Sequence, residues 1–277
     1  MPVQWAQLGA GQIVVASSRG AWLQRPEPSL FALRGDMTDS IAATLQTTRH
    51  LFDGAIAAAE RAAPPYVRPW PMTRTRWEWE LIGQWYTARH SVALLPELIE
   101  RFGDDGRADL AVFTRRKLRE ESGHDQFAVE SLSAIGYDSA ALVRAVAPPP
   151  DAAAVVEYAR ACARGETPVE FLGYAYALER RVIRISPETI AFVDALFDPG
   201  IDATAGMRAH AGELDTGHVE EFIAFATALP AADRARMALG CYRTTELACA
   251  APPGGDPTES DLAGRFEPFR RTVAVTE

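Results

Sequence analysis

The chain has 277 residues, of which 48% are hydrophobic and 23% are charged, and its formal net charge is −9. This length and composition are those of a globular protein with ample material for a core, in one large domain or two small ones. The negative charge argues against nucleic acid or an anionic membrane surface as a ligand, because both attract basic faces.

Hydropathy, targeting and cysteine patterns indicate a reduced, cytoplasmic protein. The sequence has no apolar run of the roughly 18 residues that a membrane helix needs, and its N-terminus lacks the basic region of a signal peptide. Its three cysteines, Cys162, Cys241 and Cys249, are an odd number without metal-binding spacing. We expect a small-molecule substrate and no membrane or nucleic-acid partner, and the sequence leaves a homodimer open.

The N-terminal residues 1–36 are predicted to be irregular, with GQIVVASS (11–18) as one candidate strand. Gly9 and Gly11 match the start of a dinucleotide-binding motif. The third glycine and a following helix are missing, so we do not expect such a site.

From Thr38 onward the pattern is helical. In the first half of the chain we predict three helices, the third a single long helix that Gly136 closes: residues 39–63, 75–102 and 108–136.

Helix-start signals recur in the second half. TPVE (167–170), in which Thr167 caps the helix and Glu170 reaches back, and SPET (186–189) each begin a helix. Further helices are expected at residues 152–164, 203–228 and 231–250. We therefore predict an all-α protein with an irregular segment at 1–36, a single domain of about seven or eight helices at 37–250, and a Pro/Gly-rich surface tail at 251–277.

Two helical stretches, LREESGHDQF (118–127) and HAGELDTGH (210–218), combine acidic and imidazole side chains with apolar stripes. Glu121 and His124 are three residues apart, as are Asp215 and His218, so each pair would share one helix face. Glu179 lies on a stripe of apolar residues, where an unpaired carboxylate is costly. A bound metal ion would compensate these charges, and we predict a metal site.

His210 needs a separate explanation, because it lies five residues before Asp215, about 140° round an ideal helix. Gly212 and Gly217 each weaken this helix by roughly 1 kcal/mol, and a one-residue π-bulge would bring His210 round. Glu213 is the competing carboxylate and ranks below Asp215.

Three stretches show a combined pattern: REESGHDQFAVESLSAIG (119–136), PVEFLGYAYALE (168–179) and HAGELDTGH (210–218). The first is similar to a Glu-Glu-x-Gly-His helix, the second to a Gly-x-x-x-Ala-Leu-Glu helix and the third to a His-x-x-x-Asp-x-x-His helix. Together, over about residues 75–230, they resemble the heme-oxygenase-like di-iron oxidases and oxygenases. The resemblance implies a heme-oxygenase-like helical bundle, the fold of pyrroloquinoline-quinone synthase and thiaminase II.

The same resemblance implies two Fe(II) ions per chain and O2 as co-substrate. Glu121 and His124 would hold one iron, His210, Asp215 and His218 the other, and Glu179 would bridge the two. The implied activity is that of an O2-dependent oxidase or oxygenase acting on a small amino-acid-like or carboxylate substrate in specialised metabolite biosynthesis. One arginine would suit the substrate carboxylate, with four candidates: Arg74, Arg76, Arg89 and Arg116.

The chain departs from the family pattern on the first core helix, which often supplies an acidic ligand. Here GQWYTARHS (83–91) has Trp85 and Tyr86 at that place, so that Glu80, His90 or no residue would serve. The ligand types leave manganese open instead of iron. Two alternatives remain: a cofactor-free enzyme of the same fold, with one of the three cysteines as a thiaminase-like nucleophile, and a non-catalytic helical binding protein.

Overall fold

The computed structural model describes residues 3–24, 43–63, 72–210, 213–251 and 255–271, with the side chains of Ala10 and of residues 213–216 left out. The chain divides into two compact units, each assembled from segments far apart in the sequence. The first unit comprises Met1–Pro65, Tyr158–Val182 and Glu213–Ala250, and the second comprises Tyr66–Glu157, Ile183–Gly212 and Ala251–Glu277.

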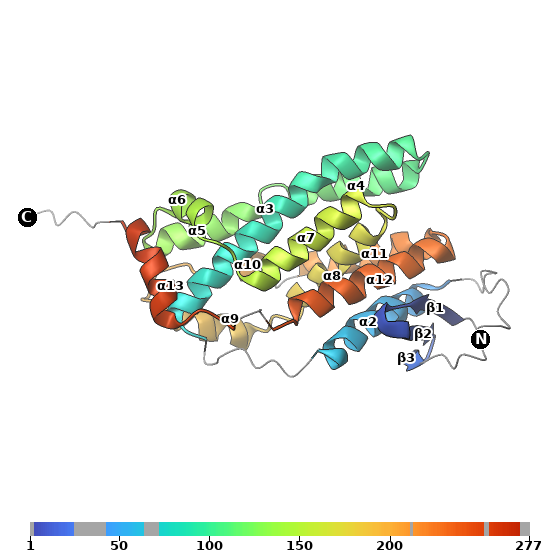
Figure 1. The fold of residues 1–277 in the computed structure, drawn as a ribbon, viewed down its shortest axis with the longest axis horizontal. Helices are drawn as coiled ribbons and strands as arrows, with labels where there is room; N and C mark the ends of the chain where they lie inside the picture. Colours follow the sequence, from blue (N-terminus) through green and yellow to red (C-terminus); the bar gives the residue numbers. More distant parts are fainter. Residues whose placement is uncertain (1–2, 25–42, 64–71, 211–212, 252–254, 272–277) are drawn as a thin grey trace, which may run out of the picture. The chain divides into compact units, whose positions relative to one another are not determined.

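A small antiparallel sheet begins the first unit and packs on α2 (Leu45–Ala62) (Figure 1). Its strands are β1 (Val3–Gln7), β2 (Ile13–Ser17) and β3 (Gly20–Gln24), in the order β1-β2-β3, with the 3-10 turn η1 (Gly9–Gly11) before β2. A methyl group added to Gly54 of α2 would lie 2.6 Å from Cβ of Ala21, so helix and sheet are in direct contact. The candidate strand at 11–18 is confirmed as β2, but the prediction that the rest of the segment is irregular is wrong for β1 and β3. Each strand has only five residues, and it is the pairing between strands that makes them a sheet.

The remaining helices of the first unit pack closely. They are α8 (Glu170–Val182), α11 (Glu213–Ala228), α12 (Ala231–Ala248) and the last part of α7 (Pro150–Arg164). Where α8 meets α12, a Cβ on Gly173 would lie 1.9 Å from Met237 O, and one on Gly240 would lie 2.2 Å from Glu170 O. Only glycine fits this contact, which brings the two backbones together.

The second unit is built around the long helix α3, which packs on α4 and α5. Its helices are α3 (Arg74–Asp104), α4 (Ala108–Glu121), α5 (Asp125–Ile135), α6 (Ser139–Ala145), the first part of α7, α9 (Pro187–Asp194), α10 (Ala205–His210) and α13 (Glu259–Phe266), with the 3-10 turn η2 (Glu267–Phe269).

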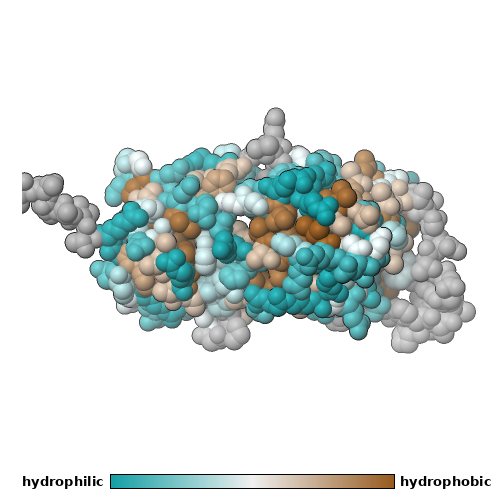
Figure 2. All heavy atoms as spheres, turned by 90° about the horizontal axis from the view of Figure 1, so that it is seen from above, coloured by the Kyte–Doolittle hydropathy of each residue, from teal (hydrophilic) through white to brown (hydrophobic). Residues whose placement is uncertain are grey.

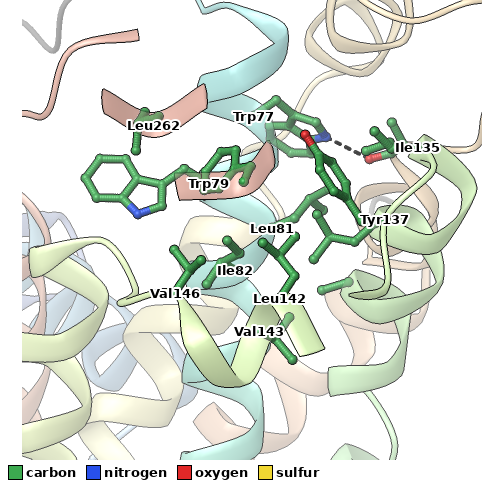
Figure 3. Close-up of a cluster of buried hydrophobic side chains, with 14 of the residues drawn as sticks. Trp77, Trp79, Leu81, Ile82, Ile135, Tyr137, Leu142, Val143, Val146 and Leu262 are labelled. Atoms are coloured by element: carbon green, nitrogen blue, oxygen red, sulfur yellow. Dashed lines mark hydrogen bonds between the residues drawn. The ribbon is translucent and has the colours of Figure 1, made fainter. Parts of the chain in front are cut away.

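Figure 3 shows the hydrophobic core of the second unit, in which Trp77 and Tyr137 are fully or nearly buried. Their polar atoms are satisfied: Trp77 Nε1 donates to Ala203 O (2.8 Å), and the Tyr137 hydroxyl donates to Glu78 Oε2 (2.8 Å). Arg74 Nε completes the pairing of the buried Glu78 carboxylate at 3.1 Å. The polar atoms of these three side chains are thus paired, as burial favours.

Local start and stop signals are confirmed. Ser186 accepts a hydrogen bond from Thr189 N at the start of α9, and Gly136 ends α5 with a φ of +108°. The Thr167 hydroxyl donates to Glu170 Oε1 (2.8 Å), so the predicted signal does precede α8.

Two predicted long helices are each divided. The helix expected at 108–136 is α4 and α5, separated at Gly123, whose φ of +96° lies outside the helical region. In the stretch expected to be one helix at 203–228, α10 ends at His210 and α11 begins at Glu213, with residues 211–212 outside the described part. The predicted tail also contains a helix, α13, which Thr258 caps together with Asp261. The domain boundaries themselves stay a prediction.

The fold is predominantly helical, with the small sheet as an addition, so the predicted fold class is confirmed. Hydrophilic residues cover most of the face drawn in Figure 2, and hydrophobic residues gather in smaller patches among them. Among the described helices, none combines the length and the apolar character that crossing a membrane requires.

Candidate metal centre

Glu121 and His124 are brought together by the turn between α4 and α5. His124 N donates to Glu121 O (3.2 Å), and His124 Nδ1 lies 2.9 Å from Glu121 Oε2. Glu121 and His124 are therefore close together, as predicted. They are close because of the turn between α4 and α5, and not because they share a face of one long helix. Gly123 is the residue whose left-handed backbone permits this turn.

His210, at the end of α10, joins this pair. Its ring centroid lies 4.9 Å from that of His124 and 6.1 Å from that of Phe127. α10 packs directly on α5, since a Cβ added to Gly206 would lie 3.4 Å from Cβ of Phe127, close to ordinary van der Waals contact. The second unit thus groups one carboxylate and two imidazoles. His210 lies beside His124 because α10 ends there, and the predicted π-bulge in one continuous helix is not what positions it.

The charge state of Glu121 follows from its neighbours. Burial favours the neutral acid, but the adjacent His124 ring and the positive charge of Lys117, with a smaller effect of His210, outweigh burial and lower the pKa of Glu121. The carboxylate is therefore ionised at neutral pH, which is the form that binds a metal ion.

Glu179 and His218 form a second pair, within the first unit. Glu179 lies on α8 and His218 on α11, and His218 Nδ1 is 3.7 Å from Glu179 Oε1. This distance is too long for a hydrogen bond. Two ligands bound to one metal ion at about 2.0–2.2 Å each lie at most about 4.4 Å apart, so the two atoms fit the spacing of metal ligands.

The orientation of α8 is fixed by the residue that follows Glu179. Arg180 donates from Nε (2.9 Å) and Nη2 (2.8 Å) to the two carboxylate oxygens of Asp53 on α2, and the Tyr176 hydroxyl donates to the same carboxylate (2.9 Å). Because a bidentate pair restricts rotation, Glu179 is held on the neighbouring face of α8. The sequence prediction missed Asp53, whose only local signal is a carboxylate inside an Ala-rich helix.

Asp215 and Glu213 lie on α11 with His218, but their side chains are outside the described residues. The α11 backbone places Asp215 three residues before His218, so the two share a helix face. The assignment of Asp215 as a ligand, ranked above Glu213, stays a prediction.

Comparison with known proteins adds evidence on the fold. No family model matches the chain, and no curated protein matches it. A solved crystal structure from Shewanella denitrificans, of a domain of unknown function with a heme oxygenase-like fold, is similar over 80% of this chain and 91% of its own. The two share 17% sequence identity, with a TM-score of 0.53. The chain has a heme-oxygenase-like fold.

α3 is the first core helix, on which the resemblance predicts a further acidic ligand. Glu80 is partly buried there, and His90 Nδ1 lies 2.8 Å from Tyr86 O of the same helix. The His90 ring also packs on the Tyr86 ring, with centroids 4.1 Å apart. These contacts hold His90 along its own helix, and the ligand from α3 stays open.

Each of the four arginines predicted to bind a substrate carboxylate lies beside an acidic side chain of this protein. The pairs are Arg74–Glu78 (3.1 Å), Arg76–Glu259 (2.9 Å), Arg89–Asp125 (3.8 Å) and Arg116–Glu120 (3.8 Å). The two short pairs leave Arg74 and Arg76 as structural residues, whereas the longer pairs hold Arg89 and Arg116 less tightly.

Two of the three cysteines lack the environment of a nucleophile. Burial raises the pKa of the Cys162 thiol to about 12 against the opposing hydrogen bond with Tyr158, and burial holds the pKa of Cys241 well above its usual range. An activated cysteine requires the opposite shift, because the thiolate is the reactive form. A thiaminase-like role is therefore disfavoured for these two residues.

Proposed function

We propose that the protein is a non-heme di-iron, O2-dependent oxidase or oxygenase that acts on a small amino-acid-like or carboxylate substrate in specialised metabolite biosynthesis. The observation that carries the proposal is the Glu179–His218 pair, spaced too widely for a hydrogen bond and suitably for two metal ligands. The second unit offers a matching group in Glu121, His124 and His210. The heme-oxygenase-like fold, which many enzymes share, is consistent with this function.

We further propose that the chain uses the whole ligand set that the resemblance implies. Glu121, Glu179 and His218 are of the donor types that could hold a metal ion. The proposed ligands are Glu121, His124, Glu179, His210, Asp215 and His218.

Iron, when bound, would supply the chemistry that activates dioxygen. The protein's residues have simpler tasks. Glu121 is kept ionised by its cationic neighbours, and Asp53 and Arg180 hold the helix that carries Glu179. The Phe127 ring lies beside both imidazoles, with its centroid 5.7 Å from that of His124 and 6.1 Å from that of His210, and gives that side an apolar surface.

Anaerobic titration with Fe(II) tests the proposal, followed by rapid mixing with oxygenated buffer while visible absorption is recorded. We expect about two irons per chain and a transient absorption band after mixing. Glu179→Gln should lose iron uptake. Glu246→Gln is the matched control. Glu246 lies on α12, where it pairs with Arg243 (2.6 Å) and accepts a hydrogen bond from the Tyr242 hydroxyl (3.5 Å). Neither partner is a proposed ligand, so this variant should keep wild-type uptake.

Two outcomes would overturn the proposal. One is a folded wild-type protein that takes up no iron. The other is uptake that is equal in Glu179→Gln and Glu246→Gln, which would mean that the iron binds elsewhere. A catalytic activity that survives chelation of the metal would instead support the cofactor-free relatives of the heme-oxygenase-like fold.

A further inference from the structure

The buried face of α4 changes from apolar to charged as the helix approaches Glu121. Leu110, Phe113 and Thr114 are at most 3% exposed, and Lys117, the next residue on this face, is 4% exposed. One turn later the helix ends at Glu121. A lysine therefore occupies the last buried position before the proposed metal ligand.

Lys117 is buried more deeply than its acidic partner. Its Nζ lies 2.7 Å from Glu120 Oε2, yet the Lys117 side chain is 5% exposed whereas that of Glu120 is 25% exposed. Glu120 also lies 3.8 Å from Arg116, a more exposed cation on the same helix. The Phe113 ring lies 6.0 Å from Nζ.

A surface pair between Glu120 and an arginine would serve the helix equally well without burying an ammonium, since exposed ion pairs cost little to form. Burial of a charge is costly unless opposite charges compensate it. The nearest proposed ligand that can use it is Glu121, four residues along the same helix face. A protonated lysine has no lone pair, so Lys117 is not itself a ligand.

We propose that Lys117 is a built-in counter-ion of the metal centre. It neutralises the carboxylates at the end of α4 while no metal is bound, and it repels the ion when one binds. The centre is thereby loaded reversibly rather than permanently. This inference rests on the proposed function, and it concerns the regulation of the same site.

The reasoning is electrostatic. Without metal, Glu120 and Glu121 are adjacent negative charges, and the ammonium between the apolar layer and Glu121 offsets them. The same ammonium would repel a divalent cation held by Glu121, four residues along α4, and this repulsion would weaken binding. Removing the ammonium should therefore lower the stability of the metal-free protein and raise its affinity for metal. Loss of an ion pair with a purely structural role would lower the stability without raising the affinity.

The test compares Lys117→Met, which continues the apolar stripe at similar length, with Lys117→Arg, which keeps the charge. Mn(II) alone is the probe, because its binding can be followed by electron paramagnetic resonance without oxygen chemistry. We expect Lys117→Met to bind Mn(II) about tenfold more tightly than the wild type and to melt at a lower temperature without metal. Lys117→Arg should stay close to the wild type in both measurements.

Glu120→Gln provides a second variant, in which Lys117 is retained and its ion pair with Glu120 is removed. The net charge near Glu121 becomes more positive, so Mn(II) binding should weaken several-fold. If the wild type binds Mn(II) and Lys117→Met binds it equally or more weakly, or if Glu120→Gln binds it more tightly, the counter-ion role is wrong while the metal centre stands. If neither the wild type nor any variant binds Mn(II), both the inference and the proposed metal centre are overturned.

Discussion

The three cysteines differ in burial, and their reactivity should differ accordingly. Cys162 and Cys241 are buried with raised pKa values, whereas Cys249 is only partly buried. At about pH 8 a disulfide reagent should modify one thiol rapidly in the folded protein and all three in urea, because only the thiolate reacts. Cys249→Ser should abolish the rapid phase. Rapid modification of two or more thiols in the folded wild type would contradict the burial of the other two.

At the scale of single residues, the candidate ligands could be recognised from the sequence because residue type and spacing are local properties. Their supporting residues could not. Asp53 is 127 residues away from Arg180, so only the packing of α2 near α8 reveals their pairing. The burial of Lys117 likewise depends on the contact of α4 with α3. In the sequence itself, Lys117 is one basic residue in the run TRRKLRE (114–120).

The contact of α8 with α12 gives a prediction at the scale of the element. In Gly173→Ala the new methyl would meet Met237 O at 1.9 Å, and backbone oxygen cannot move aside as a side chain can. We expect the free energy of unfolding to fall by about 3 kcal/mol or more. Urea denaturation monitored by circular dichroism measures it.

Gly264→Ala is the control for that substitution. Gly264 lies inside α13, and a Cβ there meets nothing within 4 Å, so alanine should stabilise the helix by up to about 1 kcal/mol. A Gly173→Ala protein as stable as the wild type would show that the two helices are further apart than in the structure.

Helix ends were predictable where a cap residue determines them, as at Ser186 and Gly136. The break at Gly123 was not, because the flanking residues continue a helical pattern and a lone glycine is tolerated within a helix. The sheet could not be predicted for a related reason. Its five-residue strands acquire their identity from pairing and from contact with α2, which a reading of local periodicity does not include.

At the scale of the whole molecule, each compact unit contains one carboxylate–imidazole pair, and the chain passes several times between the units. Segments distant in sequence must therefore meet before either unit has its core, and such non-local contacts slow folding. The resemblance to the heme-oxygenase-like fold nevertheless identified the architecture, because motifs on three separate helices restrict how those helices can be arranged.

Buried groups in both units determine how the molecule responds to alkaline pH. Among the described residues, burial, more than any neighbouring group, raises the pKa values of six side chains: Tyr137, Tyr158, Cys162, Tyr176, Cys241 and Tyr242. In the unfolded chain cysteine titrates near 8.5 and tyrosine near 10. Above those values the unfolded chain loses protons that the folded chain keeps, so the free energy of unfolding falls as pH rises.

This stabilisation is complete below about pH 8 and is lost progressively from about pH 9 upward, toward the raised pKa values of the folded state. Urea midpoints should therefore be level from neutral pH to about 8 and decline at about pH 9 and 10.5. Tyr176→Phe removes one of the titrating groups, so its decline should be shallower, although loss of the hydrogen bond to Asp53 lowers its stability at neutral pH. Midpoints that stay constant up to about pH 10.5 would contradict the prediction. Because Tyr137 belongs to the second unit and the other five groups to the first, alkaline hydrogen exchange should increase in α8 and α12 before it increases in α3.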